Sequence, residues 1–133
     1  MATKLILIIS TLDRDHNFLG LFDQGLNIWK KQLEFSACGS EEFFPIFKKF
    51  VSQKQLLNLK AVVIEQGCGS FSGLRLEAAI ANSLKIKNNN LQLFSVKADN
   101  IQDLKTKIIK NKDLISVVDF IFPEYPGQAS IHK

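Results

Sequence analysis

Runs of apolar residues without polar alternation occur twice in the chain. Residues 4–10 (KLILIIS) and 60–66 (KAVVIEQ) each have the length of one strand, and the lack of alternation is typical of strands buried on both faces of a sheet. Residues 18–22 and 26–35 flank the short turn 23–25 and predict a hairpin with a positive φ at its glycine. The second arm alternates imperfectly, so we expect it at an exposed edge.

Two longer segments carry the pattern of helices. The first begins at Ser40, a candidate cap that two glutamates follow, and is predicted to end near residue 55. Pro45 lies too deep for a first-turn proline, so we expect a kink or a later start. The second helix runs from about residue 74 to residue 87, and its apolar side chains surround the helix axis almost completely.

The last part of the chain predicts a strand, a helix and another strand. Residues 91–96 alternate as a strand. Asp99 with Gln102 three positions later resembles a capping box. One amphipathic stripe follows it, formed by Ile101, Leu104, Ile108 and Ile109. A final strand is expected within residues 115–122.

The order of these elements is three meandering strands followed by alternating helices and strands. This order is that of an α/β sheet with a ribonuclease H-like topology. A single domain of residues 1–133 is the natural expectation at this length. Residues 99–133 would then be its C-terminal helix-strand-tail segment.

Composition and charge narrow the class of protein. An apolar share of 46% excludes a disordered chain, and no apolar run reaches the ~18 residues that a membrane span requires. We expect a cytoplasmic protein in which both cysteines, Cys38 and Cys68, are reduced. The net charge of +4 comes from scattered lysines with only two arginines. This pattern is typical of a solvated surface and does not favour direct RNA binding.

The two helices predicted between residues 40 and 87 carry more apolar surface than one face of a sheet covers. On the first, Phe43, Phe47 and Phe50 belong to an arc wider than an ordinary apolar stripe. On the second, Ala78 and Ala81 would let another helix approach closely. We therefore predict a partner-binding surface built from both helices. The alternative is an apolar second helix that side chains of the first helix half cover.

Glycines gather between the second buried strand and the second helix. Gly67, Gly69, Ser70 and Gly73 can present backbone N–H groups to a phosphate near a helix N-terminus. The segment is not a Walker-type loop, because its last glycine is followed by Leu-Arg and not by Lys and a hydroxyl residue. A tight turn with a serine cap for the helix is at least as good an interpretation.

The sequence predicts neither a catalytic residue nor a metal site. Cys68 lies near a helix start, where a thiolate is stabilised, but the only histidines are His16 and His132, and neither is an evident base for it. A ribonuclease H-type nuclease begins with a carboxylate on the first strand, and this strand has none. A peptidase using Ser70 would need a histidine that we cannot locate.

Residues 67–75, Gly-Cys-Gly-Ser-Phe-Ser-Gly-Leu-Arg, resemble the signature G-P-G-S-F-T-G-L-R of the TsaB family, also called YeaZ. Seven of the nine positions agree. Residues 39–46 are similar to the family's helix start H-S-E-x-L-L-P-x-I, and residues 7–11 lie where its first strand ends A-I-D-T-S. The likeness covers about residues 4–100 and indicates a short form that lacks most of the family's second lobe.

This resemblance implies an actin-like ATPase domain fold and a subunit without transferase activity of its own. In the family, the subunit pairs with TsaD, which carries the metal and transfers a threonylcarbamoyl group to adenosine N6 beside the anticodon of tRNAs that read ANN codons. TsaE, an ATPase, joins the pair in a larger complex, and homodimers also form. Contact with tRNA would be indirect. The resemblance places these further residues at the partner-binding surface: Ser70, Phe71, Ser72, Gly73, Leu74 and Arg75.

Two positions depart from the family pattern. Ile9 stands where the family has an aspartate that helps to position a nucleotide-bound metal, and Gly39 replaces the histidine of H-S-E. We therefore expect no cofactor bound by this chain alone, and ATP only at a composite interface with a partner. Two alternative functions stay open, a small nucleotide-binding ATPase that uses the glycine loop and a stand-alone homodimeric interaction protein.

Overall fold

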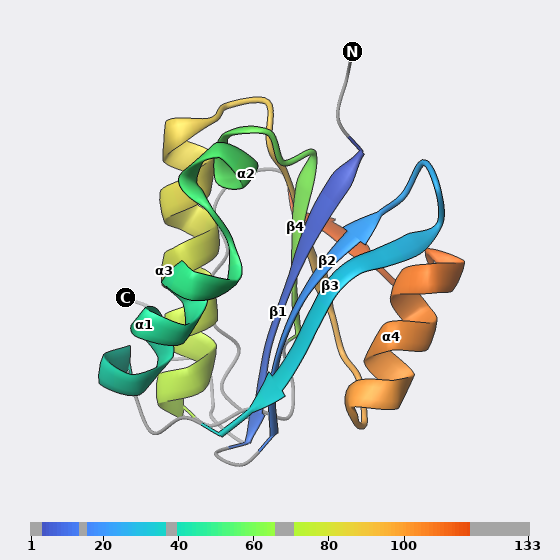
Figure 1. Cartoon of the computed structure of the whole chain (residues 1–133). Coiled ribbons are helices and arrows are strands. Elements are labelled where there is room, and N and C mark those ends of the chain that lie inside the picture. The colour runs from blue at the N-terminus through green and yellow to red at the C-terminus, as the bar shows by residue number, and fades with distance from the viewer. Residues whose placement is uncertain (1–3, 14–15, 37–39, 66–70, 118–133) are drawn as a thin grey trace, which may run out of the picture.

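A six-stranded mixed sheet with helices on both faces organises the chain (Figure 1). The structure is a computed structural model and describes residues 4–13, 16–36, 40–65 and 71–117. The strands lie in the order β3-β2-β1-β4-β5-β6. They are β1 (Leu5–Asp13), β2 (His16–Asp23), β3 (Ile28–Phe35), β4 (Ala61–Glu65), β5 (Gln92–Val96) and β6 (Ile115–Val117).

The helices divide between the two faces of this sheet. Figure 1 shows α1, α2 and α3 on one face and α4 on the other. Their bounds are α1 (Ser40–Phe50), α2 (Gln53–Leu57), α3 (Phe71–Lys87) and α4 (Ile101–Lys110). The predicted order of a three-strand meander followed by helices and strands in alternation is confirmed.

β1 lies in the middle of the sheet, as its continuous apolar run predicts. It pairs antiparallel with β2 and parallel with β4, so Leu7 is opposite Leu21 on one side and Val62 on the other. All three side chains are fully buried. β3 forms one edge of the sheet, and most of its residues are exposed, so the prediction of an exposed edge strand is also confirmed.

An apolar cluster covers each face of the sheet. The cluster under α1 and α3 contains alternate residues of β1, β2 and β4 together with aromatic residues of α1. The cluster under α4 contains the other set of alternate residues, such as Ile6, Ile8 and Phe18, and the helix residue Leu104. Because successive side chains of a strand point to opposite faces, a strand between two such clusters must be apolar throughout.

The β2–β3 turn differs from the prediction in its length and in its left-handed residue. It spans residues 24–27, and the positive φ of 58° falls on Asn27, not on the glycine. Asparagine tolerates this conformation better than other residues with a side chain. The Asp23 carboxylate accepts a hydrogen bond from the Leu26 backbone N–H at 3.0 Å, which closes the turn.

Ser52 divides the predicted first helix into two. α1 begins at Ser40, contains Pro45 and ends at Phe50, so the later start is wrong. Ser52 then caps α2 with a capping box, in which its hydroxyl accepts from the Gln55 N–H at 3.1 Å and the Gln55 side chain accepts from the Ser52 N–H at 3.0 Å. Serine competes for backbone hydrogen bonds in this way, which favours a new helix start over continuation.

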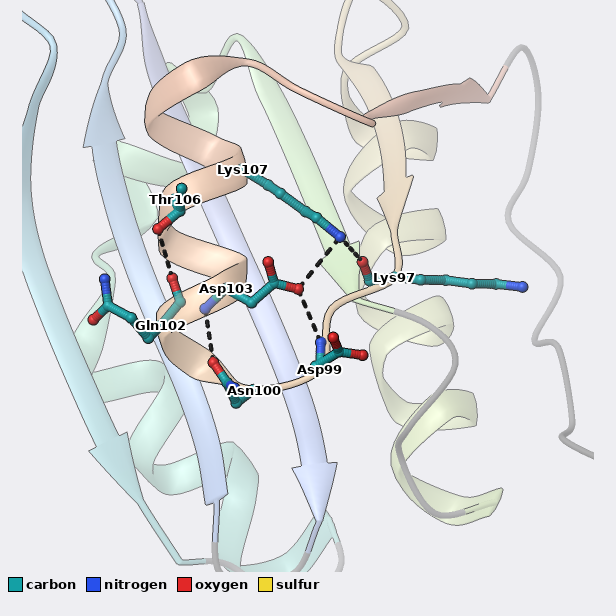
Figure 2. Close-up of polar contacts among 7 residues, drawn as sticks. All are labelled: Lys97, Asp99, Asn100, Gln102, Asp103, Thr106 and Lys107. Carbon is teal, nitrogen blue, oxygen red and sulfur yellow. Dashed lines mark hydrogen bonds and ion pairs between the residues drawn. The ribbon is translucent and has the colours of Figure 1, made fainter.

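α4 is capped one residue later than the sequence predicts. The Asn100 side chain accepts a hydrogen bond from the Asp103 N–H at 2.8 Å, while Asp103 accepts one from the Asp99 N–H at 3.0 Å (Figure 2). The Asp99 N–H and the neighbouring Lys107 lower the pKa of Asp103. Lys107 also donates to the Lys97 carbonyl at 2.7 Å. Together these contacts tie the first turns of α4 to the chain that leaves β5.

Three of the four residues predicted to form the apolar stripe of α4 are buried. Ile101, Leu104 and Ile108 are buried, whereas Ile109 is 44% exposed. β6 ends at Val117, and the rest of the predicted final strand lies outside the described residues. Over the ranges that the structure describes, no helix is long and apolar enough to cross a bilayer.

Candidate functional site

Polar side chains meet near the carboxyl ends of β1 and β4. Ser10 and Thr11 lie near the end of β1, and Glu65 is the last residue of β4. Glu77 reaches the same place from α3. All four residues are buried, with exposures of 3% or less. Carboxyl ends of parallel strands are where open α/β sheets bind their ligands.

Glu77 joins α3 to β1. Its Oε2 atom accepts a hydrogen bond from the Thr11 N–H at 3.1 Å and another, shorter one from the Thr11 hydroxyl. Its Oε1 atom has no hydrogen-bond partner among the described residues. Burial, together with the nearby Glu65 carboxyl, raises the pKa of Glu77 well above its ordinary value. Glu77 therefore keeps its proton at pH values where an exposed glutamate has lost it.

Glu65 is the second carboxyl of this group. Its Oε1 atom accepts from the Ser10 hydroxyl at 3.5 Å. Two carboxyls in one buried site repel each other when both are ionised, which helps to raise the pKa of Glu77. We call the set of Ser10, Thr11, Glu65 and Glu77 the carboxyl cluster.

The carboxyl cluster is difficult to predict from the sequence. Glu77 lies within an apolar helix and Glu65 ends an apolar strand, but residues so far apart in sequence come together only through the fold. The one usable signal is that both carboxylates occur in largely apolar segments. A carboxylate in such a position needs polar partners, because burying it alone is costly.

Among the described residues, the carboxyl cluster offers hydrogen bonds and a group that holds a proton. In the described ranges, no three His, Cys, Asp or Glu side chains are arranged to hold a metal ion. The end of β1 carries the hydroxyls of Ser10 and Thr11. The cluster is buried, and its best-defined contact is the attachment of α3 to β1 through Glu77 and Thr11.

The predicted glycine-loop residues Gly67, Gly69 and Ser70 lie outside the described residues. Phe71, Ser72, Gly73 and Leu74 form the first turn of α3, which starts three residues earlier than predicted. Their side chains are not among those described. Phosphate binding by this segment therefore stays a prediction.

The predicted exposed surface requires a correction. Five of its residues are buried within the chain itself, with exposures between 0% and 7%. They are Phe43, Phe47, Phe50, Ala78 and Ala81. All five belong to one apolar cluster that also contains residues of β1, β2 and β4. The alternative, in which side chains of the first helix half cover the second, stays a prediction. Their contact with a partner stays a prediction.

A narrower outward face remains on α3. Arg75, Ala79, Ser83 and Ile86 are exposed at helical spacing, Ile86 to 68%. On α1, Phe44 is 39% exposed and packs edge-on against its buried neighbour Phe43. We call the four α3 residues the α3 outer face. Of the residues predicted to contact a partner, Arg75 belongs to it.

The fold defines a class of α/β proteins with a mixed sheet, a three-strand meander and parallel crossovers through helices. No protein-family profile matches the sequence, and neither does any curated protein. Among solved structures, the chain resembles YeaZ from Pseudomonas aeruginosa, with a TM-score of 0.60 and 14% identity over 84% of this chain. It also resembles an uncharacterized protein described as similar to peptidase YEAZ from Pseudomonas aeruginosa, with a TM-score of 0.54 and 15% identity over 74%.

These likenesses cover only part of the matched proteins. The chain spans 51% of the length of the first and 44% of the second. At sequence identities of 14% and 15%, the likeness shows a shared fold and nothing beyond it. The resemblance to the YeaZ family that residues 67–75 carry is confirmed at that level.

Proposed function

We propose that this chain acts as a TsaB-type partner subunit, without catalytic residues of its own. It would pair with a TsaD-type protein and support threonylcarbamoyl transfer to adenosine N6 in tRNA. The observation that carries the proposal is the YeaZ fold over 84% of the chain, in which the family-like residues 67–75 lead from β4 into α3. The sheet order further supports an actin-like class of fold.

The α3 outer face is the surface that we assign to the partner. Arg75 belongs to the family-like segment, and Ala79 and Ser83 are small enough for a second helix to approach closely. Ile86 adds exposed apolar area at the end of the helix. The attachment of Glu77 to Thr11 holds the first half of α3 against the sheet. A helix held in this way presents its outer face with little loss of freedom on binding.

The substitution Ala79→Glu should therefore weaken association with TsaD. The new side chain would place a charge and extra volume between two helices, and we expect a loss of at least about tenfold in affinity, or roughly 1.4 kcal/mol. Isothermal titration calorimetry with TsaD from the same organism measures it. Gln102→Glu is the control, because Gln102 is an exposed residue of α4 and α4 lies on the other face of the sheet. This variant should bind as the wild-type chain does.

Two results would count against this proposal in different ways. Failure of the wild-type chain to bind TsaD, or to restore the modified adenosine in a TsaB-deficient bacterium, would overturn the function. Normal binding by Ala79→Glu would leave the function and overturn the surface. Self-association that competes with TsaD would instead favour the homodimeric interaction protein.

A further inference from the structure

A cavity of about 370 Å³ lies at the end of the sheet opposite the carboxyl cluster. Residues near the beginnings of β1, β4 and β5 line it, and the turn between α4 and β6 closes another side. Its volume is at the small end of the range for ligand pockets, roughly 300–1,000 Å³. Nothing in the proposed function uses this cavity.

The floor of the cavity is apolar and belongs to the core. Ile6, Ala61 and Val63 are buried on the α4 face of the sheet, and Phe94 and Leu114 pack against the same cluster. Since neighbouring strands fix these positions, the floor exists before any ligand enters. It suits an aliphatic or aromatic group.

Lys60 supplies a positive charge at the rim. Its Nζ donates to the Gln24 side-chain oxygen at 2.7 Å, which holds the ammonium group in place. The backbone of the same residue donates to the Leu5 carbonyl at 2.8 Å and accepts from the Gln92 N–H at 3.1 Å. Among the described residues, the side chain of Lys60 thus contacts an uncharged amide and no carboxylate. Its charge is available to an anionic group.

Asp113, a residue of negative charge, also lines the cavity. It lies in the turn after α4, where Asn111 and Asp113 both have positive φ, 52° and 61°. The Asn111 N–H bonds to the Ile108 carbonyl at 3.1 Å and holds the start of this turn against the helix. Within the described part of the chain, Asp113 forms no ion pair with Lys60 or with any other residue.

We propose that this cavity binds a small zwitterion with an apolar side chain, namely a free α-amino acid. Lys60 would bind the carboxylate, Asp113 the ammonium group, and the floor the side chain. Two opposite charges that form no ion pair with described residues, together with an apolar floor, match all three parts of such a molecule. A fatty acid or an apolar amine would satisfy only one charge. The site would be separate from the α3 outer face.

The test is calorimetric titration of the full chain with leucine and with phenylalanine. Matched probes remove one charge at a time: 4-methylpentanoate lacks the ammonium group and 3-methylbutylamine lacks the carboxylate. We expect binding of at least one amino acid below millimolar concentration and a loss of about tenfold or more with either matched probe, because charge-assisted hydrogen bonds are the strong ones.

Two variants locate the binding. Lys60→Gln and Asp113→Asn should each weaken amino-acid binding about tenfold or more, while Lys54→Gln, an exposed lysine of α2, should leave it unchanged. No heat from either amino acid, equal binding of 3-methylbutylamine, or unchanged binding by Lys60→Gln would overturn the proposal. Because the assay uses this chain alone, its outcome does not depend on association with TsaD.

Discussion

Replacing Ala78 with glutamate should unfold the chain. Ala78 is 3% exposed and lies in the cluster between α3 and the sheet. A glutamate there would need space that the packed cluster lacks, and it would bury a carboxylate without a partner. We expect a cost of roughly 3–5 kcal/mol, comparable to the whole stability of a small domain. Urea unfolding followed by circular dichroism measures it.

Ala79→Glu is the matched control, because the same substitution is made at the next residue of the same helix. Ala79 is exposed, so its glutamate should change the free energy of unfolding by less than about 0.5 kcal/mol. If Ala78→Glu folds as stably as Ala79→Glu, the packing of α3 described here is wrong. Ala78 would then belong to an exposed surface, as the sequence pattern alone predicts.

Glu77→Gln should stabilise the chain, and by more as the pH rises. The raised pKa means that the folded state holds the Glu77 proton more tightly than the unfolded state does. Its contribution to stability is complete below the ordinary pKa of 4.5 and is lost as the pH rises towards the folded pKa. In that window one proton changes the free energy of unfolding by up to about 1.4 kcal/mol per pH unit.

Glutamine keeps an oxygen that accepts from Thr11 and removes the ionisation. Unfolding in urea at a series of pH values should therefore give curves for wild type and Glu77→Gln that diverge above pH 4.5. Glu34→Gln, on the exposed edge strand β3, should instead follow the wild type. Parallel curves for wild type and Glu77→Gln would show that Glu77 is not held in its protonated form.

The sequence predicts the sheet well because its strands are locally unambiguous. Residues 4–10 and 60–66 are apolar on both faces, and only an interior position satisfies such a strand. Helix boundaries are harder, since they depend on competition between neighbouring caps. Ser52 and Asn100 become the N-caps because their side chains form hydrogen bonds that the residues beside them do not form.

Burial around α3 is harder still to predict from its sequence. An alanine-rich helix has no strong amphipathic direction, so the pattern does not distinguish Ala78, which is buried, from Ala79, which is exposed. For the same reason the sequence does not predict the burial of Glu77, whose partners lie on β1 and β4. The family-like residues 67–75 are recognisable from the sequence alone.

The central position of β1 sets an order of assembly. β1, β2 and β3 are consecutive and neighbours in the sheet, whereas the parallel partner of β1 follows only after α1 and α2. Closing that longer loop is the slower step. Until it closes, both sides of the meander stay open to water and Glu77 is far from Thr11. Because the pKa of Glu77 is raised in the folded chain, docking of α3 should be more favourable in a mildly acidic medium than in an alkaline one.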